Sequence, residues 1–295
     1  MRNANGADAG QPSVLVRIQS LLPQLAPAER RVGQAALDDP SGTSASTIGQ
    51  LARACKTSET TVLRFARAVG FSGYPDLRLA LATATGRAAA SGVAYVSGEI
   101  LPDDAIGDVI QKIAAVDAEA VSATAEQLDA RALGRVVRAL QRARRIDLYG
   151  VGASAHVAQD LQQKLVRIGR AAFASPDPSV ARSSATLLRR GDVAMAMSHS
   201  GATLDTLDCL ALAKQAGATT IALTNYPHAP LTEHADLVLT TAVRETRLRS
   251  GAMASRIAQL SVVDMLFVLI ARNDLPATMA AIERTYDAVR GRRAE

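Results

Sequence analysis

The apolar positions in the first third of the chain recur at the spacing of helices. From Val14 to Leu81 they fall three or four residues apart, in short segments that prolines and glycines separate. No stretch in this region alternates between apolar and polar residues, as a half-buried strand would. The pattern predicts a small all-helical domain over residues 13–84.

The pattern changes from residue 105 onward, where helical stretches alternate with short apolar runs. Five such runs lie at residues 146–149, 171–174, 193–197, 220–223 and 237–241. Short strands separated by helices are typical of a doubly wound parallel sheet. With two further helical stretches, 252–271 and 277–289, they predict an α/β domain over residues 105–295, so the whole chain combines an α domain with an α/β domain.

Two segments outside these patterns predict connections rather than packed elements. Residues 1–12 are polar and rich in alanine and glycine, which predicts a disordered arm and not a secretory signal. Residues 85–104 are rich in alanine, glycine and serine and predict a linker that is helical only at its start. No apolar run approaches the roughly 18 to 20 residues of a membrane span, so we expect a soluble, cytoplasmic protein without a membrane partner.

Charge and cysteine content narrow the function classes. The formal net charge of +5 permits nucleic-acid binding. Residues 51–78 are locally basic, with five Lys and Arg side chains and only two acidic ones, Glu59 and Asp76. Cys55 and Cys209 are the only cysteines, and each occupies an apolar position of a helical pattern. They are expected to be buried free thiols, and we expect neither a metal site nor a cofactor.

The basic segment contains two short helical patterns joined by a tight break. The first has Ile48, Leu51, Ala52 and Cys55 on one face, and the second has Val62, Phe65, Ala66 and Val69. Ser58 is expected to cap the second helix, and Gly70 is expected to follow its last residue. The pair predicts a helix-turn-helix, either simple or winged.

The predicted DNA contacts lie in the break and on the outward face of the second helix: Lys56, Thr57, Ser58, Thr60, Thr61, Arg64 and Arg67. Residues near the start of a recognition helix read base edges, as we expect for Thr60, Thr61 and Arg64. Lys56, Arg67 and Arg53 are expected to contact phosphates. Spacing alone leaves open an ordinary helical hairpin with a solvated basic face.

The first predicted strand runs into the loop Gly150-Val-Gly-Ala-Ser154, and a helix follows. Glycine lets the backbone approach a ligand, and unpaired N–H groups at a helix N-terminus attract an anion. The same loop also satisfies the G-x-G-x-x-A pattern, with Asp177 after the second strand where a ribose-binding carboxylate would lie. A dinucleotide site is therefore an alternative.

The third strand ends in a second polar loop, Ser198-His-Ser-Gly-Ala-Thr203, again followed by a helix. Its hydroxyls and backbone N–H groups favour a phosphate monoester, and Thr224-Asn225 end the next strand at the same edge. Helix capping is the alternative for each hydroxyl. His156 and His199 are either acid–base groups or surface imidazoles, and Glu245 is either a site carboxylate or part of a loop ion pair.

These motifs together resemble the RpiR family, in which a helix-turn-helix precedes a SIS (sugar isomerase) domain. The resemblance covers nearly the whole chain. In the first half it rests on Leu25-Ala-Pro-Ala-Glu-Arg30, Ile48-Gly-Gln-Leu-Ala52, Ser58-Glu-Thr-Thr-Val-Leu-Arg-Phe65 and Gly70-Phe-Ser-Gly-Tyr74. In the second half it rests on the two polar loops and on Ser255-Arg-Ile-Ala-Gln-Leu260 with Asp264.

The resemblance implies a SIS-type αβα sandwich and a regulator that senses a sugar phosphate without turnover. Ser154, Ser198, Ser200 and Thr203 would hold the phosphate, and Glu245 looks like the carboxylate that isomerising SIS enzymes use as a base. The full set of implied effector-binding residues is Gly152, Ser154, Ser198, His199, Ser200, Gly201, Thr203 and Glu245.

The favoured function is therefore a DNA-binding regulator of carbohydrate metabolism whose operator affinity responds to a phosphosugar. A phosphosugar isomerase with an accessory helical domain is the second hypothesis, and a dinucleotide-dependent regulator or dehydrogenase is the third. Because one recognition helix buries little surface and two-fold dimers read inverted half-sites, we expect a homodimer or a dimer of dimers.

Overall fold

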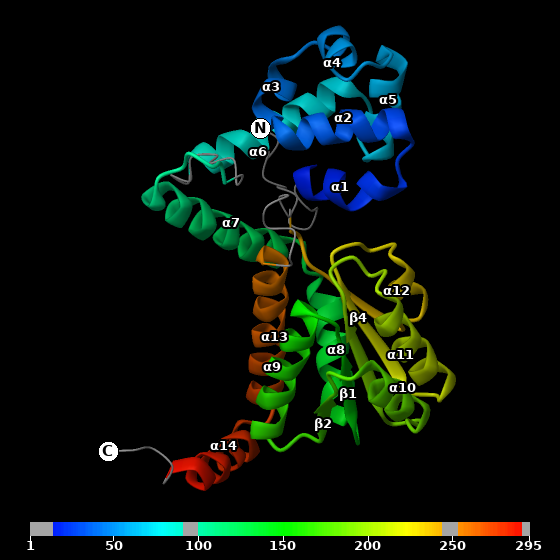
Figure 1. Ribbon diagram of the computed structural model, residues 1–295, viewed down its shortest axis with the longest axis vertical. Coiled ribbons are helices and arrows are strands. Elements are labelled where there is room, and N and C mark those ends of the chain that lie inside the picture. Colours follow the sequence, from blue (N-terminus) through cyan, green and yellow to red (C-terminus); the bar gives the residue numbers. More distant parts are fainter. Residues whose placement is uncertain (1–13, 91–99, 244–252, 291–295) are drawn as a thin grey trace, which may run out of the picture. The chain divides into compact units, whose positions relative to one another are not determined.

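A computed structural model describes residues 14–90, 100–243 and 253–290 of the chain (Figure 1). The chain divides into two compact units, Met1–Gln127 and Leu128–Glu295. The predicted N-terminal arm, residues 91–99 of the predicted linker and Glu245 lie outside the described residues. Residues 106–127 form a helix of the first unit, whereas the sequence boundary at residue 105 assigns them to the second domain.

The described part of the first unit consists of helices only, as the apolar pattern predicts, so its helix-turn-helix lacks a β-wing there. The elements are α1 (Val14–Leu21), η1 (Leu22–Gln24), α2 (Pro27–Asp38), α3 (Pro40–Ala45), α4 (Ile48–Ala54), α5 (Glu59–Ala68), α6 (Tyr74–Ala90) and α7 (Ile106–Gln127). The first residues of the predicted linker thus continue α6.

Helix α5 supplies the centre of the core of this unit. Val62, Phe65 and Ala66 on its inner face have no exposed surface and pack with Ile18 and Leu77 from α1 and α6. The larger of these side chains, such as Val62 and Phe65, contribute about 1.5 to 3 kcal/mol each when buried, relative to exposure to water. The orientation of α5 is therefore fixed by its apolar face, which leaves its opposite face for solvent or a partner.

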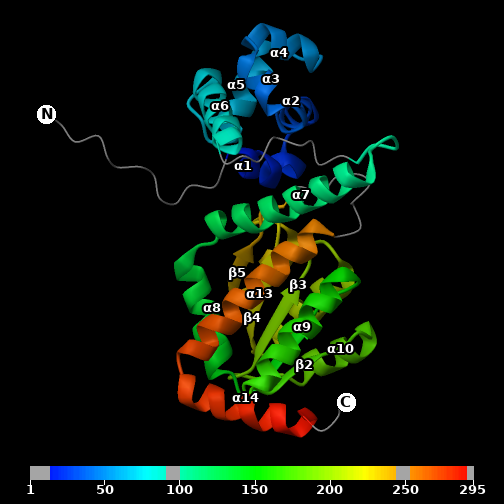
Figure 2. The same cartoon turned by 90° about the vertical axis from the view of Figure 1, so that its left-hand side faces the viewer.

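The second unit contains a parallel sheet of five strands in the order β2-β1-β3-β4-β5 (Figure 2). The strands are β1 (Ile146–Tyr149), β2 (Ala172–Ala174), β3 (Val193–Met197), β4 (Thr219–Thr224) and β5 (Leu237–Thr240). The order reverses between β1 and β3, which is the position where open α/β sheets bind ligands at the carboxyl edge. The predicted doubly wound fold is confirmed.

Helices cover both faces of the sheet (Figure 1). One layer contains α8 (Ala130–Arg142), α9 (Ala153–Arg167) and α13 (Ala254–Arg272), and the other contains α10 (Pro178–Thr186), α11 (Leu204–Gln215) and α12 (Pro230–Glu233). Alternate residues of β3 enter opposite layers: Met195 packs among the first set, and Ala194 and Ala196 among the second. The last helix, α14 (Leu275–Arg290), packs on α13 and α9.

Among the described helices, α13 has the length and mean hydropathy, 1.7, that would allow it to cross a membrane. Val262, Leu266 and Ile270 belong to the core under the sheet, and the helix packs on α8 and α9. Burial against these neighbours accounts for the apolar character of the segment. The sequence shows no uninterrupted apolar run here because Arg256, Gln259 and Asp264 divide it.

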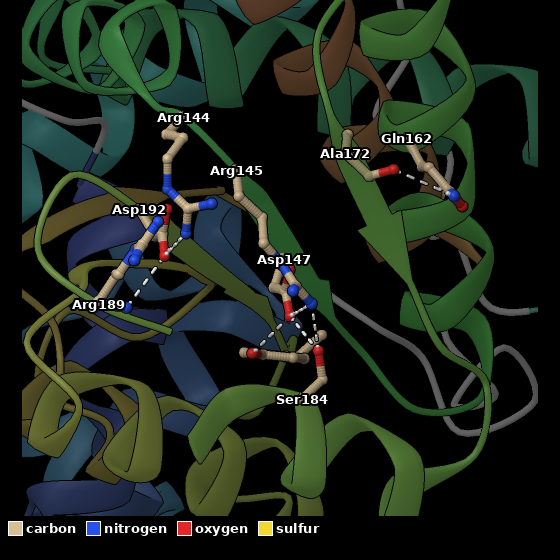
Figure 3. Close-up of polar contacts among 9 residues, drawn as sticks. Arg144, Arg145, Asp147, Gln162, Ala172, Ser184, Arg189 and Asp192 are labelled. Carbon is tan, nitrogen blue, oxygen red and sulfur yellow. Dashed lines mark hydrogen bonds and ion pairs between the residues drawn. The ribbon is translucent and has the colours of Figure 1, made fainter. Parts of the chain in front are cut away.

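Two buried carboxylates, Asp147 in β1 and Asp192 just before β3, form ion pairs and hydrogen bonds with neighbouring residues (Figure 3). Asp147, 2% exposed, accepts from Arg145 Nε at 2.7 Å and from Ser184 Oγ of α10 at 2.5 Å. Asp192 accepts from Arg144 Nη2 at 2.7 Å. Burial, with the nearby Asp147 carboxylate, raises the pKa of Tyr149, so its phenol stays protonated. These charges are paired within the fold and are not available to a ligand.

Candidate functional site

The helix-turn-helix is closed by local caps at both ends of α5. Ser58 Oγ accepts from the backbone N–H of Thr61 at 3.2 Å, which confirms the predicted N-cap. At the other end Gly70 has a φ of 84° and follows the C-cap Val69, as predicted for a C′ glycine. Helix α4 begins with a capping box between Thr47 and Gln50.

The turn between α4 and α5 is held by a residue that the sequence patterns did not single out. The guanidinium of Arg31 on α2 donates from Nε to the carbonyl of Cys55 and from Nη2 to that of Lys56, each at 3.0 Å. Lys56 has a φ of 50°, a left-handed conformation that favours glycine. In the sequence Arg31 is a basic residue 25 positions before Lys56. Residue spacing alone does not show that its guanidinium reaches this turn.

The predicted DNA contacts divide by exposure. Lys56, Ser58, Thr60, Arg64 and Arg67 are exposed, as Arg53 also is, and Thr57 is half-buried.

Thr61 was predicted on the outward face, and this is wrong, because it is 7% exposed. It lies four residues before Phe65, on the face that packs into the core, and its hydroxyl lies 3.0 Å from Ser58 Oγ.

Arg64 is an exposed cation with a defined partner. Its Nε lies 3.1 Å from Glu29 Oε1 of α2, while 60% of the Arg64 side chain remains accessible. Such an exposed ion pair contributes about 0 to 1 kcal/mol to stability, so the guanidinium is free to exchange its partner at small cost. Glu29 therefore orients the Arg64 side chain on the outer face of α5, and the guanidinium can still leave this ion pair to bind DNA.

In the second unit, the two polar loops leave neighbouring strands at the reversal point of the sheet. Tyr149, the last residue of β1, lies opposite Ala196 of β3, so the loops that begin at Gly150 and Ser198 start side by side. The structure thus brings Gly152 and Ser154 to the same edge as Ser198, His199, Ser200, Gly201 and Thr203. Glu245 lies outside the described residues.

The β1 loop needs both of its glycines for different reasons. A Cβ on Gly150 would lie 2.5 Å from the carbonyl oxygen of Ser154, so Gly150 permits close packing of loop on helix. Gly152 has φ 59° and ψ −126°, and no atom lies within 4 Å of where its Cβ would be. Open space at the start of α9 leaves room for a ligand to approach the backbone.

The β3 loop is a compact turn built around Ser198 and Gly201. Ser198 is 4% exposed, and its Oγ accepts from Gly201 N at 3.1 Å and lies 3.2 Å from Thr203 Oγ1. Gly201 has a φ of 61°, and a Cβ there would lie 2.4 Å from Ala229 Cβ. The exposed Ser200 accepts from Ala202 N at 3.2 Å, and the half-buried His199 ring packs edge-on against Tyr226.

The helices that begin at this edge of the sheet differ in whether a side chain already caps their N-terminal N–H groups. An N-terminus without such a cap can bind an anion. The N-cap residues of α9 and α11, Gly152 and Thr203, make no side-chain cap hydrogen bond. In contrast, Asp177 caps α10, with its Oδ1 accepting from Ser179 N at 2.7 Å and from Val180 N at 3.2 Å. Asp177 is the carboxylate that would bind the ribose of a dinucleotide. Because it caps α10 instead, the dinucleotide alternative is weaker.

The polar end of β4 has a structural role. Thr224 Oγ1 donates to the carbonyl of His199 at 3.2 Å, and Asn225 accepts from Val243 N at 2.8 Å through Oδ1. Both side chains therefore fix the β3 loop and the segment after β5.

Neither cysteine takes part in a disulfide. Cys55 and Cys209 are free and buried, as predicted, and burial raises the pKa of Cys209 to about 11. Within the described ranges, no group of three or more His, Cys, Asp and Glu side chains could hold a metal ion.

Both units of the chain match known protein families. A model of the helix-turn-helix domain of the rpiR family matches residues 13–87, and a SIS domain model matches residues 139–269. The chain belongs to the RpiR family of helix-turn-helix transcriptional regulators. The predicted family and the SIS-type fold are confirmed.

Individual relatives match this chain along most of their length. The chain is 37% identical over 276 residues to an uncharacterised helix-turn-helix transcriptional regulator of Caldanaerobacter subterraneus, covering 94% of this chain and 96% of the relative. It is 31% identical to RpiR of Escherichia coli, covering 81% and 79%. A solved structure, Vibrio vulnificus NanR complexed with ManNAc-6P, shares 30% identity with a TM-score of 0.61 over 95% of this chain and all of NanR.

Proposed function

We propose that this RpiR-family protein controls genes of carbohydrate metabolism by binding operator DNA through α5 and a phosphorylated sugar at the β1–β3 edge. The observation that carries the effector assignment is the pairing of two helix N-termini without side-chain caps, at α9 and α11, with buried serines beside both. The protein acts in the cytoplasm, where operator DNA and sugar phosphates occur together.

The DNA assignment is supported by the surface of α5 and of the turn before it. Thr60 and Arg64 are exposed near the start of the helix, and Lys56 and Arg67 flank them. A recognition helix places such residues against base edges and phosphates of the major groove. Membership of a family of helix-turn-helix regulators makes an ordinary solvated hairpin the weaker alternative.

The effector assignment follows from the chemistry of a phosphate monoester. A dianion gains from the positive ends of two helix dipoles and accepts several hydrogen bonds at once. Ser154, Ser198, Ser200 and Thr203 supply hydroxyls, and Gly152 and Gly201 let the backbone approach. NanR, which matches 95% of this chain, was solved with ManNAc-6P, which supports an effector of the same chemical class.

The isomerase alternative requires an acid and a base within reach of the sugar. Its candidates are His156, His199 and Glu245. We propose binding without turnover, because the hydroxyls and backbone N–H groups of the two loops suit a phosphate and the full-length relatives are transcriptional regulators. Aldose–ketose interconversion that disappears in Glu245→Gln would instead establish the enzyme.

The experiment is a ligand-induced thermal shift of the full chain. Its panel contains ManNAc-6P, glucose 6-phosphate and fructose 6-phosphate, the three sugars without phosphate, and NAD. We expect at least one sugar phosphate to raise the unfolding temperature, and Ser154→Ala with Ser198→Ala to abolish that rise. A response to NAD alone, or to sugars with and without phosphate equally, would contradict a phosphosugar site.

A further inference from the structure

The segment Ser255-Arg-Ile-Ala-Gln-Leu260 opens α13, and one of its side chains contacts the candidate effector site. Gln259 is 1% exposed, and its Oε1 accepts a hydrogen bond from Ser154 Oγ at 3.3 Å. The two residues are 105 positions apart in the chain. Ser154 is therefore joined to a second element, α13, in addition to its own helix α9.

The direction of this hydrogen bond decides what Ser154 can do. A serine hydroxyl has one proton, and in this arrangement Gln259 Oε1 receives it. A phosphate oxygen is an acceptor only and needs that same proton. While the bond to Gln259 persists, Ser154 therefore has no proton to donate to a phosphate.

The other end of the Gln259 amide has an unused donor. Among the residues that the structure describes, its Nε2 is buried without a hydrogen-bond partner. A buried donor in this state costs free energy, but turning the amide over leaves Oε1 without a partner instead, so the exchange is favourable only when the released serine proton gains a phosphate acceptor. Turning the amide over would place Nε2 beside Ser154 Oγ, where it donates to the serine oxygen and releases the serine proton.

We propose that Gln259 is a positioning residue for effector binding, which rests on the proposed function of Ser154. When a phosphate enters, the Gln259 amide turns over. The Ser154 O–H bond to Oε1 is lost, and two bonds replace it: Nε2–H to Ser154 Oγ, and the Ser154 hydroxyl to a phosphate oxygen. Occupancy of the phosphate subsite is thereby transmitted to α13.

The test is a double-mutant cycle between Gln259 and Ser154 in the full chain. The probes are ManNAc-6P and inorganic phosphate, and affinity is measured by calorimetry and thermal shift. Gln259→Met keeps the length of the side chain and removes its polar amide. In the occupied site Met provides no Nε2 donor to orient the Ser154 hydroxyl toward the phosphate, so we expect binding of both probes to weaken by about two- to tenfold. In the Ser154→Ala background the same change should have no effect on affinity.

A second variant distinguishes the loss of the Nε2 donor from a change in packing. Gln259→Glu introduces a carboxylate that accepts the serine proton but cannot donate, and its charge repels the phosphate. We expect a larger loss than in Gln259→Met at neutral pH. That loss should shrink, relative to the parent at the same pH, when the pH is lowered and the introduced carboxyl group gains a proton to donate.

Val263→Ala is the matched control, because Val263 is fully buried one turn further along the same face of α13. It should lower the unfolding temperature and leave probe affinity unchanged. Equal losses for Gln259→Met with and without the Ser154 hydroxyl would overturn the proposal, as would unchanged affinity in both Gln259 variants. If the parent itself binds no sugar phosphate, the proposed effector function fails first, and that outcome is recognised before any variant is made.

Discussion

At the scale of single residues, Lys56 combines a strained backbone with a predicted DNA contact. Its φ of 50° is a conformation in which an L side chain costs about 1 to 2 kcal/mol. Lys56→Gly should therefore keep or raise the free energy of unfolding while it weakens DNA binding. The salt dependence of binding, as log K against log salt concentration, should become less steep by about 0.9.

Lys56→Ala is the control for this prediction, because it removes the charge and keeps the strain. Its salt dependence should match that of Lys56→Gly, and its unfolding midpoint in urea should be the lower of the two. An unchanged slope in both variants would exclude Lys56 as a phosphate contact.

Substitution of Arg64 and of Arg67 distinguishes a contact to a base from a contact to a phosphate. If Arg64 reaches a guanine, Arg64→Ala should lose about 1 to 3 kcal/mol of operator affinity and relax specificity at one position. Its loss of stability should stay below about 1 kcal/mol, because the Glu29 pair is exposed. Arg67→Ala should weaken all sequences alike and flatten the salt dependence. Fluorescence anisotropy on operator and scrambled DNA would show the difference, and identical behaviour of the two variants would contradict it.

Residues whose role depends on their neighbours in sequence could be predicted, and those with distant partners could not. Ser58 and Gly70 act as predicted, because caps follow from the adjacent backbone. Thr61 was assigned to the wrong face, since its position between outward and inward residues is decided by the packing of Phe65. Arg31 and Gln259 were missed because their partners lie 24 and 105 positions away.

At the scale of elements, apolar runs predicted the strands closely. The bounds of β1 and β3 agree with the sequence prediction, and β2, β4 and β5 differ by one residue at their ends. Runs buried on both faces leave little freedom in placing a strand. Short helices such as α12 were not predicted, since one turn has no periodicity. The loops of the site were predicted because glycine and hydroxyl residues mark the carboxyl edge.

The connection before β5 contains a carboxylate that should make stability depend on pH. Asp236 Oδ2 accepts from Thr220 N at 2.9 Å and from Thr220 Oγ1 at 3.0 Å. Burial raises the pKa of Asp236, but these hydrogen bonds and Lys214 outweigh it and lower the pKa below the ordinary 3.8. Because the folded pKa is the lower one, the stabilisation is complete above the unfolded pKa and disappears as pH falls through the folded value.

Asp236→Asn should therefore destabilise the protein at pH 7 and lose less stability than the parent between about pH 5 and pH 2, as the linkage of about one carboxyl predicts. Urea unfolding at several pH values measures this difference. A gap between parent and variant that does not narrow in acid would show that the Asp236 carboxylate adds no pH-dependent stability.

At the scale of the whole molecule, exposed apolar side chains on α13 and α14 are the surface that we expect to mediate the predicted self-association. Val268, Leu275 and Met279 are each more than half exposed. We expect sedimentation velocity to show a dimer at micromolar concentration. Val268→Arg with Met279→Arg should give a monomer of unchanged stability, whereas Leu187→Arg, at a residue 74% exposed on the other layer, should remain dimeric. A parent that is monomeric with and without DNA would contradict this expectation.

Regulation requires that the effector binds the DNA-competent and DNA-incompetent states with different affinity, because a ligand with equal affinity for both shifts nothing. The proposed effector site and α5 lie in different units of the chain. A coupling free energy of about 1 to 3 kcal/mol is typical between two such sites and corresponds to about a 5- to 150-fold change in operator affinity.

Effector control of DNA binding is tested most directly by titrating the protein on operator DNA, selected from a random pool, with and without the best sugar phosphate of the panel. The parent should change its DNA affinity at least about fivefold when the ligand saturates it. The variant with Ser154→Ala and Ser198→Ala should bind DNA like the unliganded parent and should not respond. An equal response of parent and variant would contradict the proposed site, since the effector would then act elsewhere on the protein.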